Sequence, residues 1–251
     1  MDLGIAGRRA AVAASSAGLG LASAQALAAD GVAVALCGRD RARLDDAVAS
    51  ITDVGGSAVG LVADVSTVEG AADFVHQAAD ALGGIDILVA NAGGPPAGTF
   101  ASTPLDAYLP ALELNLLSTV AMCTEAVPAM AERGWGRVVA ITSISVRQPI
   151  PTLILSNTAR AGVTGFLKTL AREVAADGVT VNSVQPGLHE TERLVQLYGG
   201  RVDGRELGVP AGVVGRPEDF GATVAYLCSD QARFITGLQL HVDGGAYAGL
   251  L

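Results

Sequence analysis

The residues whose types and spacing could do chemistry begin with a turn rich in serine and glycine. It spans residues 13–20, AASSAGLG, between a short apolar run and a helical pattern. Glycines at the start of a helix let backbone N–H groups approach a pyrophosphate. The turn therefore indicates a dinucleotide site, although a plain strand-to-helix turn has a similar composition. The candidate phosphate-binding residues are Ser15, Ser16, Gly18, Leu19 and Gly20.

A second candidate is Arg39, the first charged residue after the next apolar run, which ends in Cys37-Gly38. A site for NAD usually carries a carboxylate here to bind the ribose hydroxyls, whereas an arginine suits the 2′-phosphate of NADP. The guanidinium fork matches phosphate geometry. We therefore favour NADP(H) over NAD(H) as the cofactor. The alternative is an exposed arginine that pairs with Asp40.

The elements that must position these residues are short apolar runs alternating with longer helical patterns. Apolar runs without a period of two indicate parallel strands that are covered on both faces. Repeated strand and helix units predict right-handed crossovers in one sheet. The expected fold class is α/β: a single domain, residues 1–251, with a doubly wound, seven-stranded parallel sheet and helices on both faces. The expected strands are 10–14, 32–36, 57–62, 85–90, 137–142, 179–184 and 238–242, and the expected helices are 18–29, 41–52, 68–81, 105–133, 156–176 and 217–229.

One stretch departs from this alternation, residues 189–214, which contain Gly199-Gly200, Gly204, Gly208 and Pro210. It follows the sixth expected strand, and ligands bind beyond the carboxyl ends of such strands. A mobile substrate lid is therefore favoured over a plain surface excursion.

Further segments, taken together with the turn at 15–20, resemble the short-chain dehydrogenase/reductase family over essentially the whole chain. The branch most similar is that of the 3-oxoacyl-acyl-carrier-protein reductases. The resemblance implies a Rossmann-type fold and hydride transfer between a nicotinamide cofactor and a small carbonyl compound. The segments that carry it are Asp64-Val65, Asn91-Ala92-Gly93, Asn115, Ser143, Pro186-Gly187 with Thr191, and Val242-Asp243-Gly244-Gly245.

The resemblance also implies roles for these residues. Asp64 and Val65 would flank the adenine. Asn115 would kink its helix and hold a water, and Ser143 would hydrogen-bond a carbonyl oxygen. The residues expected on the adenosine side are Asn91, Ala92 and Gly93, and those expected to face the nicotinamide are Pro186, Gly187 and Thr191.

The chain departs from the family at the start of the glycine turn, where the family has Thr-Gly and this chain has Ala13-Ala14. Alanine holds such a turn only where φ is negative. We therefore expect negative φ at these alanines and a cofactor site that is retained but weakened.

A second departure replaces the catalytic pair of the family, a tyrosine and a lysine spaced Y-x-x-x-K. Thirteen residues after Ser143, the tyrosine position is Ser156 and the lysine position is Arg160. A serine hydroxyl is shorter than tyrosine and a far weaker acid than a phenol of pKa about 10. Arg160 stays charged, so it can stabilise an anion and bind the nicotinamide ribose, but it cannot pass on a proton as lysine can.

Three hypotheses follow. The chain could be a ketone reductase with a replacement proton source, such as a water held by Asn115 and Arg160. It could reduce an activated enone, whose enolate Arg160 and Ser143 would stabilise. It could also be a non-catalytic dinucleotide-binding sensor or scaffold. Because Asn115, Ser143 and Pro186-Gly187 are retained, we favour an oxidoreductase.

Two lid side chains could also donate a proton, His189 and Tyr198. The simpler interpretation of His189 is a solvated loop histidine. The simpler interpretation of Tyr198 is a packing residue that anchors the loop.

Composition excludes several classes of protein. The net charge of −9 argues against nucleic acid, whose binding needs a basic face. No uninterrupted apolar stretch reaches the roughly 18 residues of a membrane span. Three widely spaced cysteines indicate reduced thiols in a cytoplasmic protein, and the N-terminus shows no signal peptide. None of the three histidines has metal-ligand spacing to another histidine or a cysteine, so no metal is expected.

The helices expected at 105–133 and 156–176 are apolar beyond one stripe, so they have more than one face to bury. The resemblance makes them the dimerising pair, with residues 242–251 completing a homotetramer. We predict the mass of four subunits by light scattering. A monomer alone at micromolar concentration would contradict this.

Overall fold

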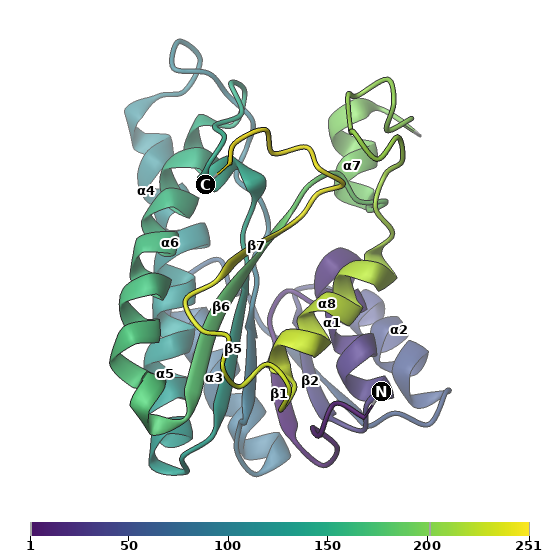
Figure 1. The fold of residues 1–251 in the computed structure, drawn as a ribbon, viewed down its shortest axis with the longest axis vertical. Coiled ribbons are helices and arrows are strands. Elements are labelled where there is room, and N and C mark those ends of the chain that lie inside the picture. The colour runs from purple at the N-terminus through teal and green to yellow at the C-terminus, as the bar shows by residue number, and fades with distance from the viewer. Residues whose placement is uncertain (1, 201, 251) are drawn as a thin grey trace.

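The computed structural model describes residues 2–200 and 202–250. They contain one seven-stranded sheet with the order β3-β2-β1-β4-β5-β6-β7, and all neighbours are parallel (Figure 1). The order reverses beside β1, which creates a switch point between β1 and β4 where ligands bind in such sheets. The predicted fold class is therefore confirmed. The strands are β1 Arg9–Val12, β2 Ala33–Gly38, β3 Ala58–Val62, β4 Ile87–Ala90, β5 Gly136–Ile141, β6 Val179–Pro186 and β7 Gln239–Val242.

Helices cover the two faces of the sheet in two layers (Figure 1). Successive residues of β1 point to opposite faces, as a strand requires: Ala10 and Val12 pack in one core, and Ala11 packs in the other. The first core includes residues of α1, α2 and α8, and the second includes residues of α3, α5 and α6. The main helices are α1 Gly18–Ala29, α2 Arg41–Thr52, α3 Val68–Leu82, α4 Tyr108–Leu112, α5 Ser118–Glu132, α6 Ile154–Val174, α7 Glu192–Tyr198 and α8 Pro217–Cys228.

The expectation of one continuous helix over 105–133 is wrong. A π-helical turn, Glu113–Leu117, separates α4 from α5. Within it the side chain of Asn115 donates to the carbonyl of Gly93 at 2.7 Å, a bond to the loop after β4. π turns insert one residue into a helix and occur often at functional sites. The other expected elements lie within three residues of the observed ones at each end.

The apolar run Leu105–Glu132 is long and apolar enough to cross a membrane by length and composition, and half of its most apolar window is buried within the protein. A mostly buried core helix can meet the same measure, so this run is weak support for a span.

Ala14, directly after β1, is the one residue other than glycine with positive φ in the described ranges, at +46°. The expected negative φ is therefore wrong for Ala14. Hydrogen bonds hold the peptide in place: its N–H lies 3.2 Å from Cys37 Sγ, and its carbonyl accepts from Asn91 Nδ2 at 3.1 Å. These two bonds fix the alanine in a conformation that favours glycine.

We predict that Ala14→Gly raises the free energy of unfolding by about 0.5–1 kcal/mol. The left-handed conformation costs a non-glycine residue about 1–2 kcal/mol, and glycine removes that cost from the folded state. Part of this stabilisation is lost because glycine also raises the conformational entropy of the unfolded chain. Ala13→Gly is the matched control. Ala13 is fully buried and has no positive φ, so its replacement should destabilise by about 1 kcal/mol. Urea unfolding measures both, and equal destabilisation would show that Ala14 stores no strain.

Candidate functional site

A cavity of about 450 Å³ opens at the carboxyl ends of the central strands and extends under α7. Because the carboxyl ends of parallel strands meet at one edge, residues far apart in the sequence converge there. The predicted site residues that line it are Gly18, Leu19, Gly20, Asn91, Ala92, Gly93, Ser143, Ser156, Arg160, Pro186, Gly187 and Thr191.

Six predicted residues do not line this cavity: Ser15, Ser16, Arg39, Asp64, Val65 and Asn115. Ser15 is fully buried, and its hydroxyl bridges the carbonyl of Val12 at 2.7 Å and the N–H of Cys37 at 3.1 Å. It therefore ties the end of β1 to β2. Ser16 stands against Gly38, where an added Cβ would lie 2.8 Å from the Ser16 hydroxyl. Neither serine side chain is placed to contact a ligand in this cavity.

The N-terminus of α1 offers its backbone to the cavity. Its cap residue, Ala17, makes no side-chain bond, and no acidic residue lies in its first turn. The first N–H groups of a helix have no partner within the helix and carry partial positive charge. Gly20 permits the close approach of the turn, since a Cβ there would lie 2.5 Å from the carbonyl of Ala14. These features suit a phosphate group.

Arg39 lies just past the tip of β2, outside the cavity lining, with a side chain 76% exposed. It pairs loosely, at 3.8 Å, with Asp64. The alternative pairing with Asp40 is wrong, because Asp40 caps α2 by accepting from the N–H of Arg43 at 3.2 Å. The guanidinium of Arg39 is thus available to a ligand beside β2.

Ser156 and Arg160 lie one turn apart on α6 and face each other in the cavity. Arg160 Nε donates to Ser156 Oγ at 3.2 Å, and Nη1 donates to the carbonyl of Ile141 at 3.1 Å. No carboxylate pairs with Arg160 among the described residues. Burial, and next the positive charge of Arg193, lower the pKa of Arg160 to about 10. The side chain is still charged at neutral pH, so the cavity carries a positive charge that favours an anion.

Two serine hydroxyls in the cavity can each donate a hydrogen bond to a ligand. The oxygen of Ser156 accepts from Arg160, and the oxygen of Ser143 accepts from the N–H of Ser145 at 3.1 Å. Each hydroxyl hydrogen remains available, because a hydroxyl has one donor in addition to its acceptor lone pairs. A carbonyl oxygen in this cavity could therefore receive bonds from Ser143 and Ser156 beside the charge of Arg160.

Asn115 lies behind the cavity wall, in the π turn. Its Nδ2 donates to Gly93, but its Oδ1 is buried without a partner among the described residues. Buried acceptors are usually satisfied, often by an ordered water. The π turn packs against α6, which carries Ser156 and Arg160.

The excursion over 189–214 contains a helix that the sequence analysis missed, α7. Thr191 caps it by accepting from Leu194, and Gly199 ends it with φ of +74°. An N-cap threonine and a C-terminal glycine are the signal that could have predicted it. Arg201, in the expected lid, and Met1 and Leu251, at the two ends of the expected domain, lie outside the described residues.

Two charged side chains hold α7 over the cavity. Glu192 forms a 2.7 Å ion pair with Arg43 of α2. Arg193 reaches the carbonyl of Pro95, in the loop after β4, at 3.4 Å. Both Glu192 and Arg193 line the cavity. No motif in the sequence singles out Arg43, Glu192 or Arg193, because their partners are distant along the chain.

The two lid candidates for proton donation differ in position. His189 is buried, 4% exposed, so its interpretation as a solvated histidine is wrong. Its ring packs edge-on against Phe220, and burial lowers its pKa, so the imidazole is neutral at neutral pH. Tyr198 is 49% exposed and does not line the cavity, so it is not placed to donate a proton there.

The three cysteines are free and buried, as expected. Burial raises the pKa of the Cys37, Cys123 and Cys228 thiols to about 12, so none is a thiolate at neutral pH. In the ranges 2–200 and 202–250, no group of three His, Cys, Asp or Glu side chains could hold a metal ion.

Comparison with known proteins agrees with this geometry. Residues 13–247 match the family model described as enoyl-(acyl carrier protein) reductase. The chain is 34% identical over 242 residues to dehydrogenase/reductase SDR family member 4 of Bos taurus, covering 95% of this chain and 87% of the relative. It is 34% identical over 241 residues to the 3-oxoacyl-[acyl-carrier-protein] reductase FabG of Haemophilus influenzae, covering 96% and 98%.

Solved structures are similar over nearly the whole chain. L-sorbose reductase from Gluconobacter frateurii, complexed with NADPH and L-sorbose, is 32% identical with a TM-score of 0.92 and full coverage of both chains. The NADPH-bound short-chain oxidoreductase from Pseudomonas aeruginosa PAO1, described as containing an atypical catalytic center, is 29% identical with a TM-score of 0.89, covering 96% of this chain and 97% of that one. Sequence, fold and site geometry together show that the chain belongs to the short-chain dehydrogenase/reductase family of oxidoreductases.

Proposed function

We propose that the protein is an NADP(H)-dependent oxidoreductase that reduces a ketone of the 3-oxoacyl type or an activated enone. In this proposal no tyrosine acts as the proton donor. The observation that carries this proposal is the convergence in one cavity of two donor hydroxyls, on Ser143 and Ser156, with the carboxylate-free guanidinium of Arg160. Donors aimed at a developing oxyanion are usually the largest single contribution to such catalysis.

The residues fit a nicotinamide dinucleotide. The uncapped N-terminus of α1 suits the pyrophosphate, and Arg39 beside β2 suits a 2′-phosphate. Gly93 leaves open space where a Cβ would project, so a ribose or base can approach its backbone. When bound, the cofactor would supply the hydride. Pro186, Gly187 and Thr191 would border the nicotinamide, and Arg160 would hold its ribose.

The remaining chemistry belongs to the side chains of the cavity. Ser143 and Ser156 would donate to the substrate oxygen. Arg160 would stabilise the negative charge that develops there, because its own oxygen partners are neutral. The stabilised anion would be an alkoxide from a ketone or an enolate from an enone. Formation of the enolate depends less on a proton donor.

The proton would come from a water held between the π turn and α6, and the hydroxide left behind would take a proton from bulk solvent. The unpartnered Oδ1 of Asn115 supports this position, because it requires a donor that the described residues do not supply. A water there would replace the phenol that the family places at position 156. The side chain of His189 is a weaker candidate, because it is packed against Phe220.

The walls of the cavity favour a substrate with an apolar body. Ile144, Ile150 and Leu153 form one side, and Leu188 and Leu194 belong to the lid side. The two relatives solved with NADPH support the cofactor assignment, and the one described as having an atypical catalytic center supports activity without the usual pair. The alternative function is a dinucleotide-binding sensor or scaffold that has lost catalysis.

We predict that NADPH binds at least about tenfold more tightly than NADH, a difference of about 1.4 kcal/mol, because Arg39 can reach a 2′-phosphate. Arg39→Ala should remove this preference and leave NADH binding unchanged. Arg172→Ala, an exposed arginine on α6, is the control and should change neither. Calorimetry measures all three proteins. Equal affinities in the unaltered protein would contradict the NADP(H) assignment, and no binding of either cofactor would favour a scaffold without a cofactor.

We also predict that Ser143→Ala lowers NADPH-dependent turnover of a ketone or enone panel by about 100-fold or more, the loss typical of one oxyanion donor. Binding of NADPH should stay within about twofold, since Ser143 is expected at the substrate. Ser145→Ala is the matched control, because Ser145 is buried two residues away and does not line the cavity. Full activity in Ser143→Ala would show that the site is placed wrongly.

A further inference from the structure

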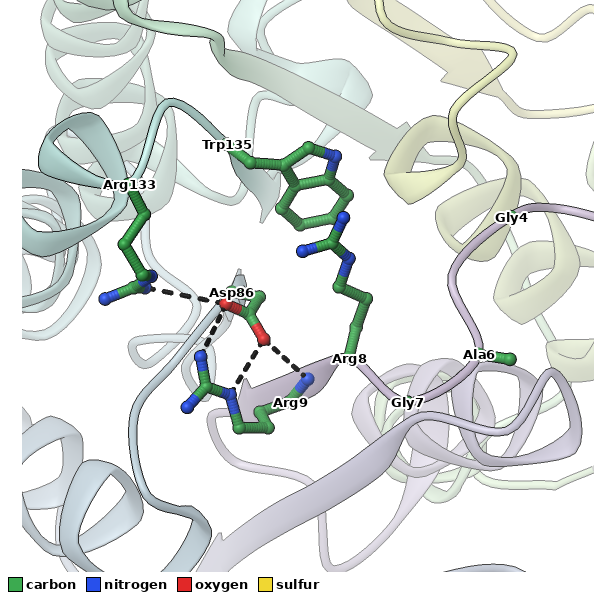
Figure 2. A pocket seen from close by; sticks show the side chains of 8 residues that line it. All are labelled: Gly4, Ala6, Gly7, Arg8, Arg9, Asp86, Arg133 and Trp135. Atoms are coloured by element: carbon green, nitrogen blue, oxygen red, sulfur yellow. Dashed lines mark hydrogen bonds and ion pairs between the residues drawn. The ribbon is translucent and has the colours of Figure 1, made fainter.

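A second cavity, of about 620 Å³, lies at the opposite edge of the sheet, where the strands begin (Figure 2). Arg9 is the first residue of β1, Asp86 immediately precedes β4, and Trp135 immediately precedes β5. Parallel strands gather these amino ends at one edge, just as they gather the carboxyl ends at the other. The cavity is therefore remote from the cofactor end.

Among the described residues that line this cavity, the single carboxylate is that of Asp86, and it is already paired with arginines. Asp86 is 4% exposed and accepts from Arg9 three times, from Nε and Nη2 at 2.8 Å and from the backbone N–H at 3.1 Å. Arg133 adds an ion pair at 3.6 Å. Figure 2 shows both arginines converging on Asp86. One carboxylate thus pairs with two guanidinium groups.

Arg8 adds a positive charge that is not paired with a carboxylate among the described residues. Its guanidinium lies 3.8 Å from the centre of the Trp135 ring, and no ion pair involves it among the described residues (Figure 2). Arg137 also lies against this ring, at 4.3 Å, and pairs with Asp230 at 3.7 Å. Four arginines therefore share two carboxylates, which leaves an excess of two positive charges in a chain whose net charge is −9.

We propose that this cavity, bounded by Arg8, Arg133 and Trp135, is a binding site for a phosphate dianion, either free or as the terminal group of a small polar ester. Two excess charges match a dianion better than a monocarboxylate. Guanidinium groups bind phosphate through paired N–H donors. The ring of Trp135 holds the Arg8 guanidinium by a cation–π contact, so its N–H edges are free for the anion.

Trp135 is the only tryptophan in the chain, so its fluorescence reports this cavity alone. The unaltered protein is titrated with inorganic phosphate at pH 8 and constant ionic strength, with acetate as the monoanion. A saturable change with phosphate in the millimolar range, absent with acetate, is expected. A change of equal size with acetate, or no saturable change with phosphate, would overturn the proposal. A second titration, with glycerol 3-phosphate, distinguishes the sources: tighter binding than phosphate indicates an ester, and weaker binding indicates free phosphate.

Substitutions of single arginines test which residues bind the phosphate. Arg133→Gln does not touch the tryptophan ring and should raise the phosphate Kd about fivefold or more, as should Arg8→Gln. Arg172→Gln on α6 is the control and should leave the Kd unchanged. The cofactor end could also attract phosphate, so Arg160→Gln is included. A loss of binding in Arg160→Gln, with binding retained in Arg8→Gln, would overturn the proposal by placing the anion at the cofactor end. Calorimetry on the same variants gives a Kd that does not depend on fluorescence, and circular dichroism confirms that each is folded.

Discussion

The cofactor end of this protein depends on how one residue, Ala14, is held between β2 and the loop after β4. Its N–H bonds to Cys37 at the tip of β2, and its carbonyl accepts from Asn91 after β4. Ser15 adds a buried bridge from β1 to β2. These bonds set where α1 begins, and Gly20 lets the turn pack without a Cβ in the way. The positive φ of Ala14 is strained for an alanine, and the two hydrogen bonds hold the residue in that conformation directly before the turn into α1.

The second constraint is a charge held in a partly apolar cavity. Arg160 has the carbonyl of Ile141 and the hydroxyl of Ser156 as partners, and neither carries a charge. A guanidinium without a carboxylate is destabilised by burial, which the lowered pKa of Arg160 reflects. An anionic group in the cavity relieves this penalty. Arg160 therefore attracts an anion, but unlike a lysine it does not exchange protons readily.

The strand and helix alternation was enough to predict the sheet, because apolar runs of parallel strands are distinctive. Local signals also mark the starts of α2, capped by Asp40, and of α8, which begins at Pro217. The features that the sequence did not predict include two that depend on partners distant along the chain. The π turn at Glu113–Leu117 depends on the bond from Asn115 to Gly93, which no local pattern reveals. The φ of Ala14 depends on partners from β2 and β4. The cavity residues named from motifs converge, whereas Arg193 and Glu192 could not be named because their contacts with Pro95 and Arg43 join distant segments.

The amino edge of the sheet shows which of its arginines stabilise the fold. Helices that cross a parallel sheet end at this edge, so some of their terminal carbonyl groups lie there and can accept from arginine side chains. Arg9 bonds to the carbonyl of Gly83, after α3, and Arg133 bonds to that of Ile85. Arg9 also forms two side-chain hydrogen bonds to Asp86, so its structural role is sufficient to explain it, whereas Arg133 pairs with Asp86 only at 3.6 Å. Arg8 has neither kind of partner in the described chain, and stacking on Trp135 leaves its N–H groups unused. The fold explains Arg9, whereas the unused N–H groups of Arg8 and of Arg133 Nε and Nη1 are available to a ligand.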